Sequence, residues 1–162
     1  MRRKMIIREI KDQDNKKMEQ IIKRSLEQVG LDIPGTAYFD PQLGNLSAFY
    51  KDKSNANYWV AVTDENEVIG GIGIGPFVGD PTVGELQKLY ISPKHQGKGV
   101  SKELMKVALD FAKKHYTYCY LETSHVLEVA NRLYSKFGFR ELTKPLEGSE
   151  HGTMDIWYIK EL

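Results

Sequence analysis

Residues 89–101 combine the features of a phosphate-binding turn. Leu89, Tyr90 and Ile91 end a predicted strand, Pro93 interrupts it, and the segment 96–101 (QGKGVS) opens a long predicted helix. Such a turn points several backbone N–H groups at one place, and the N-terminus of the helix adds positive potential. Its two glycines remove side chains that would hold an anion away. The pattern predicts anion binding; a solvated helix face after a tight turn is the alternative.

Basic residues gather at the same helix. Residues 92–116 hold six lysines and two acidic residues, a local balance of +4, whereas the whole chain is +1. The segment is not a dinucleotide fingerprint, because the third glycine and its spacing are missing, and it lacks the Gly-Lys-Ser/Thr ending of a P-loop. A basic helix start fits a ligand that carries several phosphates.

Hydrophobic periodicity and turn residues predict the elements that position this segment. Strands are predicted at 4–10, 58–62, 68–75, 84–91, 118–123, 139–142 and 153–160. Helices are predicted after Asp12 or Asp14 up to Gly30, from an Asp40-Pro41 start through Tyr50, at 99–115 and at about 128–137. The glycines within 68–75 predict a bulge or the close approach of a neighbouring group.

The order of these elements predicts a mixed α/β sheet. Short connections between the early strands favour an antiparallel meander. The later alternation of strand, helix and strand requires a crossover, so two strands run parallel and helices cover the sheet.

Three ordered segments resemble the GNAT superfamily of N-acetyltransferases. They are 86–93 (LQKLYISP), 96–101 (QGKGVS) and 133–139 (LYSKFGF), and the middle one is similar to the family's acyl-CoA motif, with serine in place of the final glycine or alanine. The order of strands and helices agrees from about residue 4 to 160. The resemblance implies a mostly antiparallel sheet whose fourth and fifth strands form a splayed parallel pair, and one domain spanning residues 1–162.

The resemblance also implies how acetyl-CoA binds as the acyl donor. Backbone amides of the turn would hold the CoA pyrophosphate, and the pantetheine arm would run along the fourth strand in the gap left by the splay. Asn131 resembles a residue that contacts the pantetheine or a phosphate. The residues implied in cofactor binding are therefore Leu89, Tyr90, Ile91, Gln96, Gly97, Lys98, Gly99, Val100, Ser101 and Asn131.

Acetyl transfer to an amine needs a base and a proton donor. An ammonium group cannot attack a thioester, so a base must take its proton. Glu85 in the fourth strand is the first candidate for this base and would act directly or through a water molecule. Glu122 and His125 are the alternatives. If they are not catalytic, the two glutamates are expected to be paired carboxylates and the histidine to be solvated. Tyr134 occupies the position of the family's general-acid tyrosine and would donate a proton or a hydrogen bond to the departing thiolate. The alternative is that Tyr134 is an aromatic side chain packed on an amphipathic helix. Cys119, in an aromatic strand, is expected to be a small core residue rather than an acylated nucleophile.

The acceptor is predicted to be a small primary amine, since no acidic run marks a groove for a basic protein tail. Alternatives are a protein lysine or N-terminal acetyltransferase and a non-catalytic acyl-CoA sensor. The candidates for lining the acceptor side are Tyr38, Phe39, Phe77, His125 and the segment 147–151.

Composition excludes several other classes. The near-neutral charge argues against a dedicated nucleic-acid binder, and no apolar run approaches the roughly 20 residues of a membrane span. The single cysteine rules out a multi-cysteine metal cluster, so no metal is expected. The single cysteine also suits a reducing compartment, and the N-terminal segment lacks the pattern of a signal peptide, so a cytoplasmic protein is expected. Trp157 and Tyr158 point to opposite faces of the last strand, so one of them is a candidate for a homodimer interface of the kind common in the resembling family.

Overall fold

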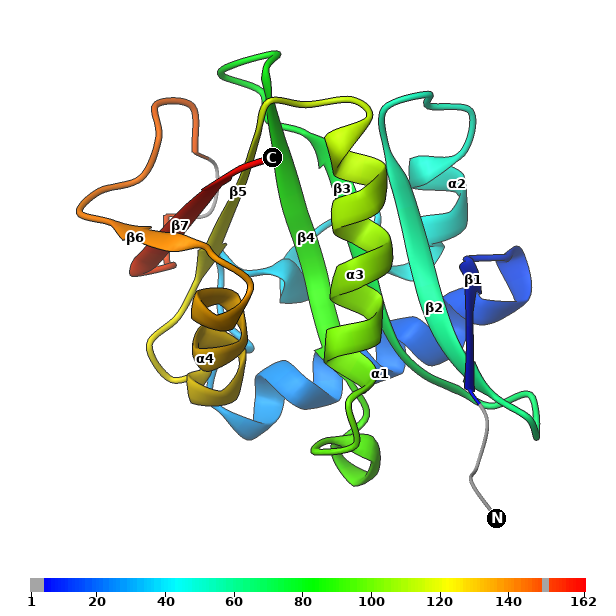
Figure 1. Ribbon diagram of the computed structural model, residues 1–162. Helices are drawn as coiled ribbons and strands as arrows, with labels where there is room; N and C mark the ends of the chain where they lie inside the picture. The colour runs from blue at the N-terminus through cyan, green and yellow to red at the C-terminus, as the bar shows by residue number, and fades with distance from the viewer. Residues whose placement is uncertain (1–4, 150–151) are drawn as a thin grey trace.

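A twisted sheet of seven strands runs through the protein (Figure 1). The structure is a computed structural model that describes residues 5–149 and 152–162. The strand order is β1-β2-β3-β4-β5-β7-β6, and within it only β4 and β5 pair in parallel. This confirms the predicted mixed α/β sheet with its parallel pair at the fourth and fifth strands. The strands are β1 (Met5–Glu9), β2 (Asn57–Thr63), β3 (Val68–Pro76), β4 (Val83–Ile91), β5 (Tyr118–Thr123), β6 (Arg140–Leu142) and β7 (Ile156–Glu161).

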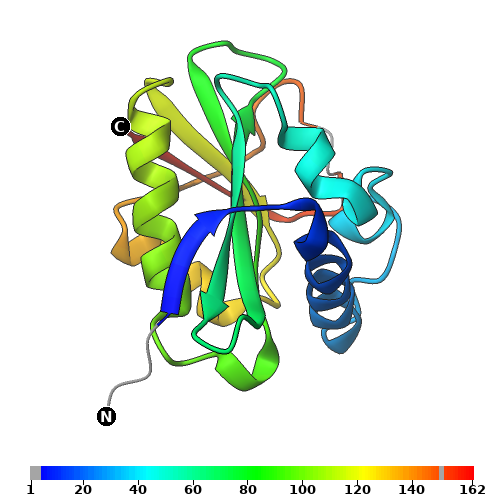
Figure 2. The same cartoon turned by 90° about the vertical axis from the view of Figure 1, so that its right-hand side faces the viewer.

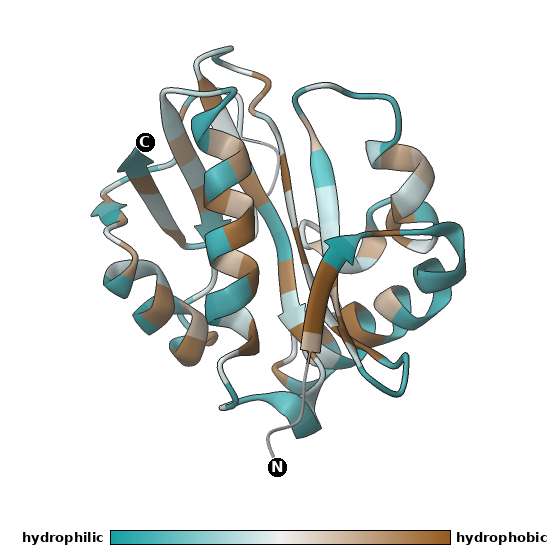
Figure 3. Cartoon of the chain, turned by 45° about the vertical axis from the view of Figure 1, so that its right-hand side comes forward, coloured by the Kyte–Doolittle hydropathy of each residue, from teal (hydrophilic) through white to brown (hydrophobic). Residues whose placement is uncertain are grey.

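Helices cover both faces of the sheet (Figure 2). One face carries α1 (Asn15–Gln28) and α2 (Leu46–Tyr50), and the other carries α3 (Val100–Lys113) and α4 (Glu128–Lys136). Alternation along β2 explains the two cores: Tyr58 and Val60 pack in the α1 cluster, whereas Trp59 and Ala61 pack in the α3 cluster. Hydrophobic and hydrophilic residues alternate along the helices in Figure 3, as expected when one face of each helix is buried.

The second helix begins later than its sequence predicts. Asp40 has an extended backbone (φ −62°, ψ 128°), and the α-helix begins only at Leu46, after short 3-10 turns. The predicted helix start at Asp40-Pro41 is therefore wrong. The Asp40 carboxylate instead pairs with Lys88 Nζ at 2.7 Å, a tertiary contact that outweighs its local capping preference.

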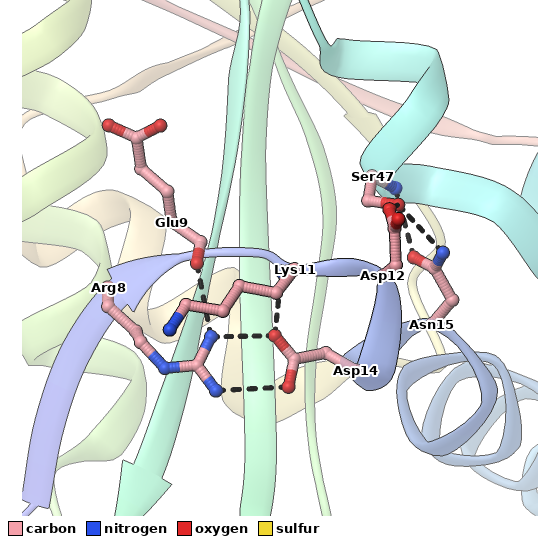
Figure 4. A network of polar contacts seen from close by, with 7 residues as sticks. All are labelled: Arg8, Glu9, Lys11, Asp12, Asp14, Asn15 and Ser47. Carbon is pink, nitrogen blue, oxygen red and sulfur yellow. Dashed lines mark hydrogen bonds and ion pairs between the residues drawn. The ribbon is translucent and has the colours of Figure 1, made fainter.

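A polar network ties the start of α1 to α2 (Figure 4). Arg8 donates two hydrogen bonds, of 2.6 and 3.0 Å, to the Asp14 carboxylate. Asn15 Nδ2 donates to Ser47 Oγ at 2.7 Å, and Ser47 Oγ donates to Asp12 at 2.7 Å. Asp14 also accepts a 2.8 Å hydrogen bond from the Lys11 backbone N–H, which caps the short 3-10 turn before α1, whereas no side-chain cap is present at the start of α1 itself. The network fixes α2, and with it Tyr50, against the sheet.

The glycines of β3 make room for neighbouring aromatic rings. A Cβ at Gly71 would lie 2.5 Å from the Tyr58 ring, and one at Gly73 would lie 2.8 Å from the Tyr50 hydroxyl. The β3–β4 register also shifts between these glycines, and Lys88 of β4 adopts a positive φ of 50°. Tyr58 donates a 2.7 Å hydrogen bond to the Lys88 carbonyl. The glycine pattern therefore marks both the bulge and the close approach that it predicted.

Candidate active site

A cleft of about 570 Å³ opens where β4 and β5 separate. The two strands pair only between Val83–Glu85 and Tyr118–Tyr120, and beyond these residues their facing edges diverge. Side chains of β4, β5, α4 and the turn before α3 line the cleft. An unpaired strand edge beside a cleft offers backbone hydrogen-bonding groups to an extended ligand.

The predicted anion-binding turn borders this cleft. Gly97 and Gly99 have φ of 78° and 80°, in the region that favours glycine, and Gly99 is the N-cap of α3. A Cβ at either glycine would meet no atom within 4 Å, so the space outside the turn is open. Gln96 Nε2 donates to the Ile91 carbonyl at 3.2 Å and holds the turn against β4. The first turn of α3 presents N–H groups that the helix itself does not satisfy.

Most of the predicted cofactor-binding residues meet at this cleft. Its lining includes Leu89, Tyr90, Ile91, Gln96, Gly97, Gly99, Val100 and Ser101. Lys98 lies between the two glycines of the turn but is not among the lining residues. The side chain of Lys98 is exposed, as expected for a residue at the tip of a turn.

Tyr134 projects from α4 into the cleft. Its side chain is buried, with its ring centroid 5.6 Å from that of Tyr158 and 6.0 Å from that of Phe139. Burial raises the pKa of the Tyr134 phenol well above its usual value, and nearby Tyr90 adds to the effect. The phenol therefore keeps its proton at neutral pH and can donate a hydrogen bond to a ligand atom in the cleft.

Asn131 lies one turn before Tyr134 and is not among the residues that line the cleft. Its Nδ2 donates to the Ser124 carbonyl at 3.0 Å and to the Leu127 carbonyl at 2.9 Å. These bonds tie the loop after β5 to the first turn of α4. The predicted contact between Asn131 and the cofactor therefore stays a prediction, and the structure assigns the side chain a role in shaping the loop.

We expect Asn131→Ala to destabilise the protein and weaken acetyl-CoA binding. Loss of two side-chain hydrogen bonds costs about 1–2 kcal/mol of unfolding free energy, and the loosened loop borders the cleft. Urea unfolding and a binding titration measure the two effects. An unchanged dissociation constant would remove Asn131 from the cofactor-binding residues.

The three candidate bases lie in different surroundings. Glu85 is half-buried on β4, where Gln87 Nε2 donates to its Oε1 at 2.9 Å, and it stands just beyond the residues that line the cleft. Glu122 lines the cleft and accepts a 2.7 Å hydrogen bond from the Tyr120 hydroxyl. His125 is 70% exposed, pairs with Asp155 and lies outside the lining.

Cys119 is fully buried on β5. Burial, followed by the charge of Glu85, raises the pKa of its thiol to about 12. Since the thiolate is the nucleophile, this cysteine is unsuited to carry an acyl group at neutral pH. We expect Cys119→Ala to retain turnover within about twofold, with only a stability loss of about 1 kcal/mol for the vacated volume. Abolished turnover, or a stable acetylated Cys119 detected by mass, would contradict direct transfer.

The predicted acceptor-lining residues lie outside the cleft. Phe39 is exposed, Tyr38 donates to Glu27, and Phe77 packs on the Tyr120 ring at 5.1 Å. Of the segment 147–151, residues 150–151 lie outside the described part of the chain. The structure instead brings two side chains of α1, the residue that follows this helix and one residue after β6 to the cleft; these are Ser25, Gln28, Val29 and Met154. No local sequence signal predicts them, because the crossing of α1 under β4 decides their place.

Trp157 and Tyr158 lie within β7, between β5 and β6. Tyr158 is buried in the α3 cluster, and Trp157 packs against the small cluster of Phe77, Val83 and Tyr120. Both side chains therefore contribute to packing within the chain, and homodimerisation stays a prediction.

The described residues contain neither a membrane-spanning helix nor a cluster of potential metal ligands. None of the helices in that part of the chain is long and apolar enough to cross a membrane. Residues 5–149 and 152–162 also hold no group of three or more His, Cys, Asp or Glu residues arranged to bind a metal ion.

Solved acetyltransferases share this fold. A GNAT acetyltransferase from Staphylococcus aureus superimposes with a TM-score of 0.85 at 20% identity, covering 98% of this chain and 99% of the other. The PaiA N-acetyltransferase of Thermoplasma acidophilum, solved in complex with coenzyme A, gives 0.75 at 20% identity, covering 98% and 99%. The splayed sheet is thus that of a GNAT-type acyltransferase.

Sequence comparison identifies the family. Residues 17–139 match the model of the Acetyltransferase (GNAT) family, and the chain belongs to that family. A relative of nearly the same length is the uncharacterized N-acetyltransferase YjgM of Escherichia coli, 34% identical over 97% of this chain and 95% of its own. The protein is therefore an acetyltransferase, as the three sequence segments predicted.

Proposed function

We propose that this protein transfers an acetyl group from acetyl-CoA directly to the primary amine of a small molecule. The observation that carries the proposal is a continuous path: the open glycine turn at the start of α3 leads along the free edge of β4 to the Tyr134 phenol. The coenzyme A complex of the Thermoplasma relative supports this donor.

The residues present fit acetyl-CoA. Amides of residues 96–101 would hold its pyrophosphate, since the turn has positive backbone potential and no side chain blocks it. The edge of β4 at Leu89 and Ile91 would pair with the pantetheine arm. Once bound, the donor supplies an activated thioester.

In the proposed reaction Glu85 is the general base and Tyr134 is the proton donor. Glu85 takes a proton from the acceptor ammonium, directly or through water, because only the neutral amine is a nucleophile. The Tyr134 phenol donates a hydrogen bond to the departing sulfur, and its raised pKa keeps that donor intact across the neutral range. The cleft would hold the thioester beside the Tyr134 phenol, so that donor and proton donor are already oriented.

Two loop contacts favour a small acceptor over a protein chain. Thr153 Oγ1 donates to the Pro34 carbonyl at 2.7 Å, which joins the loop after α1 to the segment before β7. The ion pair of Asp40 with Lys88 fastens the end of the same loop to β4. These contacts tie the loop after α1 to the rest of the protein, and we infer that they leave less room for an extended peptide than for a small amine.

A panel of amines tests the proposal. We expect free CoA to be released from acetyl-CoA with one or more amino acids or polyamines, and not with lysine peptides or peptide N-termini. Acetylation of peptides alone, detected by mass, would favour a protein acetyltransferase. Tight binding of acetyl-CoA with no turnover on any amine would favour a sensor.

A further inference from the structure

A chain of hydrogen bonds leads from α2 to the carboxylate of Glu85. The Tyr50 hydroxyl donates to Gln87 Oε1, and Gln87 Nε2 donates to Glu85 Oε1 at 2.9 Å. Gln87 and Glu85 are two residues apart on β4, so their side chains share one face of the sheet. Tyr50 reaches them from the last turn of α2.

The directions of these bonds are fixed chemically. An ionised carboxylate only accepts hydrogen bonds, so the Gln87 amide nitrogen faces Glu85 and the amide oxygen faces Tyr50, whose hydroxyl donates to it. Burial, followed by the negative charges of Glu85 and Asp40, raises the pKa of Tyr50 well above its usual value, so this hydroxyl keeps its proton. The Tyr50 hydrogen bond therefore holds the amide in this orientation, and the reversed amide would turn an oxygen toward Glu85.

Two glycines of β3 provide the space for this chain. A Cβ at Gly75 would lie 3.1 Å from Gln87 Oε1 and 3.3 Å from its Nε2. A Cβ at Gly73 would lie 2.8 Å from the Tyr50 hydroxyl. The polar network of Figure 4 holds α2 in place from the other side, through Ser47. The amide and the hydroxyl thus occupy space that side chains on β3 would fill.

We propose that Gln87 and Tyr50 are positioning residues for the base: Gln87 holds the Glu85 carboxylate in its ionised form and fixed direction, and Tyr50 sets the Gln87 amide. The inference rests on the proposed role of Glu85. A hydrogen bond donated to a carboxylate favours its charged form, so the base stays ready to accept a proton at a lower pH than it would without Gln87.

Three groups that face Glu85 keep their protons at the pH where a carboxylate titrates. Tyr50 faces it from α2, and Cys119 and Tyr120 face it from β5; the charge of Glu85 contributes to raising the pKa of each. Two charged groups lie nearby: Glu122, further along β5, accepts a hydrogen bond from the Tyr120 hydroxyl, and the charge of Lys160 on β7 acts on Cys119. A Glu85→Gln variant distinguishes the Glu85 signal from that of Glu122.

Carbon-13 NMR of labelled glutamate carboxyls in the free protein tests the proposal without any acceptor. We expect Gln87→Met, which keeps the volume but not the donor, to move the titration midpoint of Glu85 upward by about one pH unit. Tyr50→Phe should move it in the same direction by less. The double variant should shift no more than Gln87→Met alone, because Tyr50 acts through the amide.

Tyr116→Phe is the matched control, since it removes a buried hydroxyl that donates to the Asn55 carbonyl outside the cleft. It should lower stability without moving the Glu85 midpoint. An unchanged Glu85 titration midpoint in folded Gln87→Met would overturn the proposed positioning role of Gln87. An additive shift in the double variant would overturn the role of Tyr50 through the amide. Because this titration needs no acetyl transfer, its outcome is separate from the amine panel that tests the proposed function.

Discussion

Tyr134→Phe is expected to lower the turnover number at least about 100-fold while leaving the dissociation constant of acetyl-CoA within about twofold. Positioned proton donors contribute roughly 10²–10⁴-fold to rate, and in the proposed mechanism the Tyr134 phenol, which lines the cleft, is the donor to the departing sulfur. The ring itself packs against Tyr158 and Phe139, and phenylalanine keeps those contacts. Steady-state kinetics together with calorimetry separate the two effects.

The raised pKa of Tyr134 also predicts how the activity of the wild-type enzyme depends on pH. Because burial raises the pKa of Tyr134, its proton is present at neutral pH and is lost only as the pH rises above the usual phenol range. The wild-type enzyme should therefore show no loss of activity from this group up to about pH 10. Normal turnover of Tyr134→Phe across the whole pH range would refute the assigned role.

Glu85→Gln is expected to produce the second large effect, a loss of roughly 10²–10³-fold in kcat/KM near pH 7. The amide cannot accept a proton, so the variant must rely on the small fraction of amine that is already neutral in solution. That fraction grows about tenfold per pH unit below an amine pKa of about 10.4. The deficit should therefore shrink as the pH rises, which a pH–rate profile measures.

Glu122→Gln is the natural comparison, because that carboxylate lines the cleft and pairs with Tyr120. We expect it to retain most of the activity at pH 7. A larger loss in Glu122→Gln than in Glu85→Gln would transfer the base role to Glu122.

Local sequence patterns predicted the parts of the site that the backbone builds. The two glycines predicted that no side chain blocks the turn, and a strand, a turn and a helix in succession place it at a helix N-terminus. The strand and helix order likewise predicted the parallel pair of β4 and β5, whereas its splay was implied by the resemblance to the GNAT superfamily. Such features follow from residues close together in the chain, where sterics and hydrogen bonding act directly.

The missed features depend on contacts between distant segments. Asp40 has the sequence signature of a helix cap, but an ion pair with Lys88, 48 positions away, takes its carboxylate. Residues at the end of α1 line the cleft only because of how α1 crosses the sheet. Tertiary contacts of this kind override local preference, and one sequence carries no direct signal of them.

The most direct test of the account is a pair of calorimetric titrations, one with acetyl-CoA and one with S-acetylpantetheine, which lacks the nucleotide and the pyrophosphate. If the amides at the start of α3 hold the pyrophosphate, acetyl-CoA binds with saturation and the fragment binds at least about 100-fold more weakly. Equal affinities for the two molecules, or no saturation with millimolar acetyl-CoA, would contradict the account.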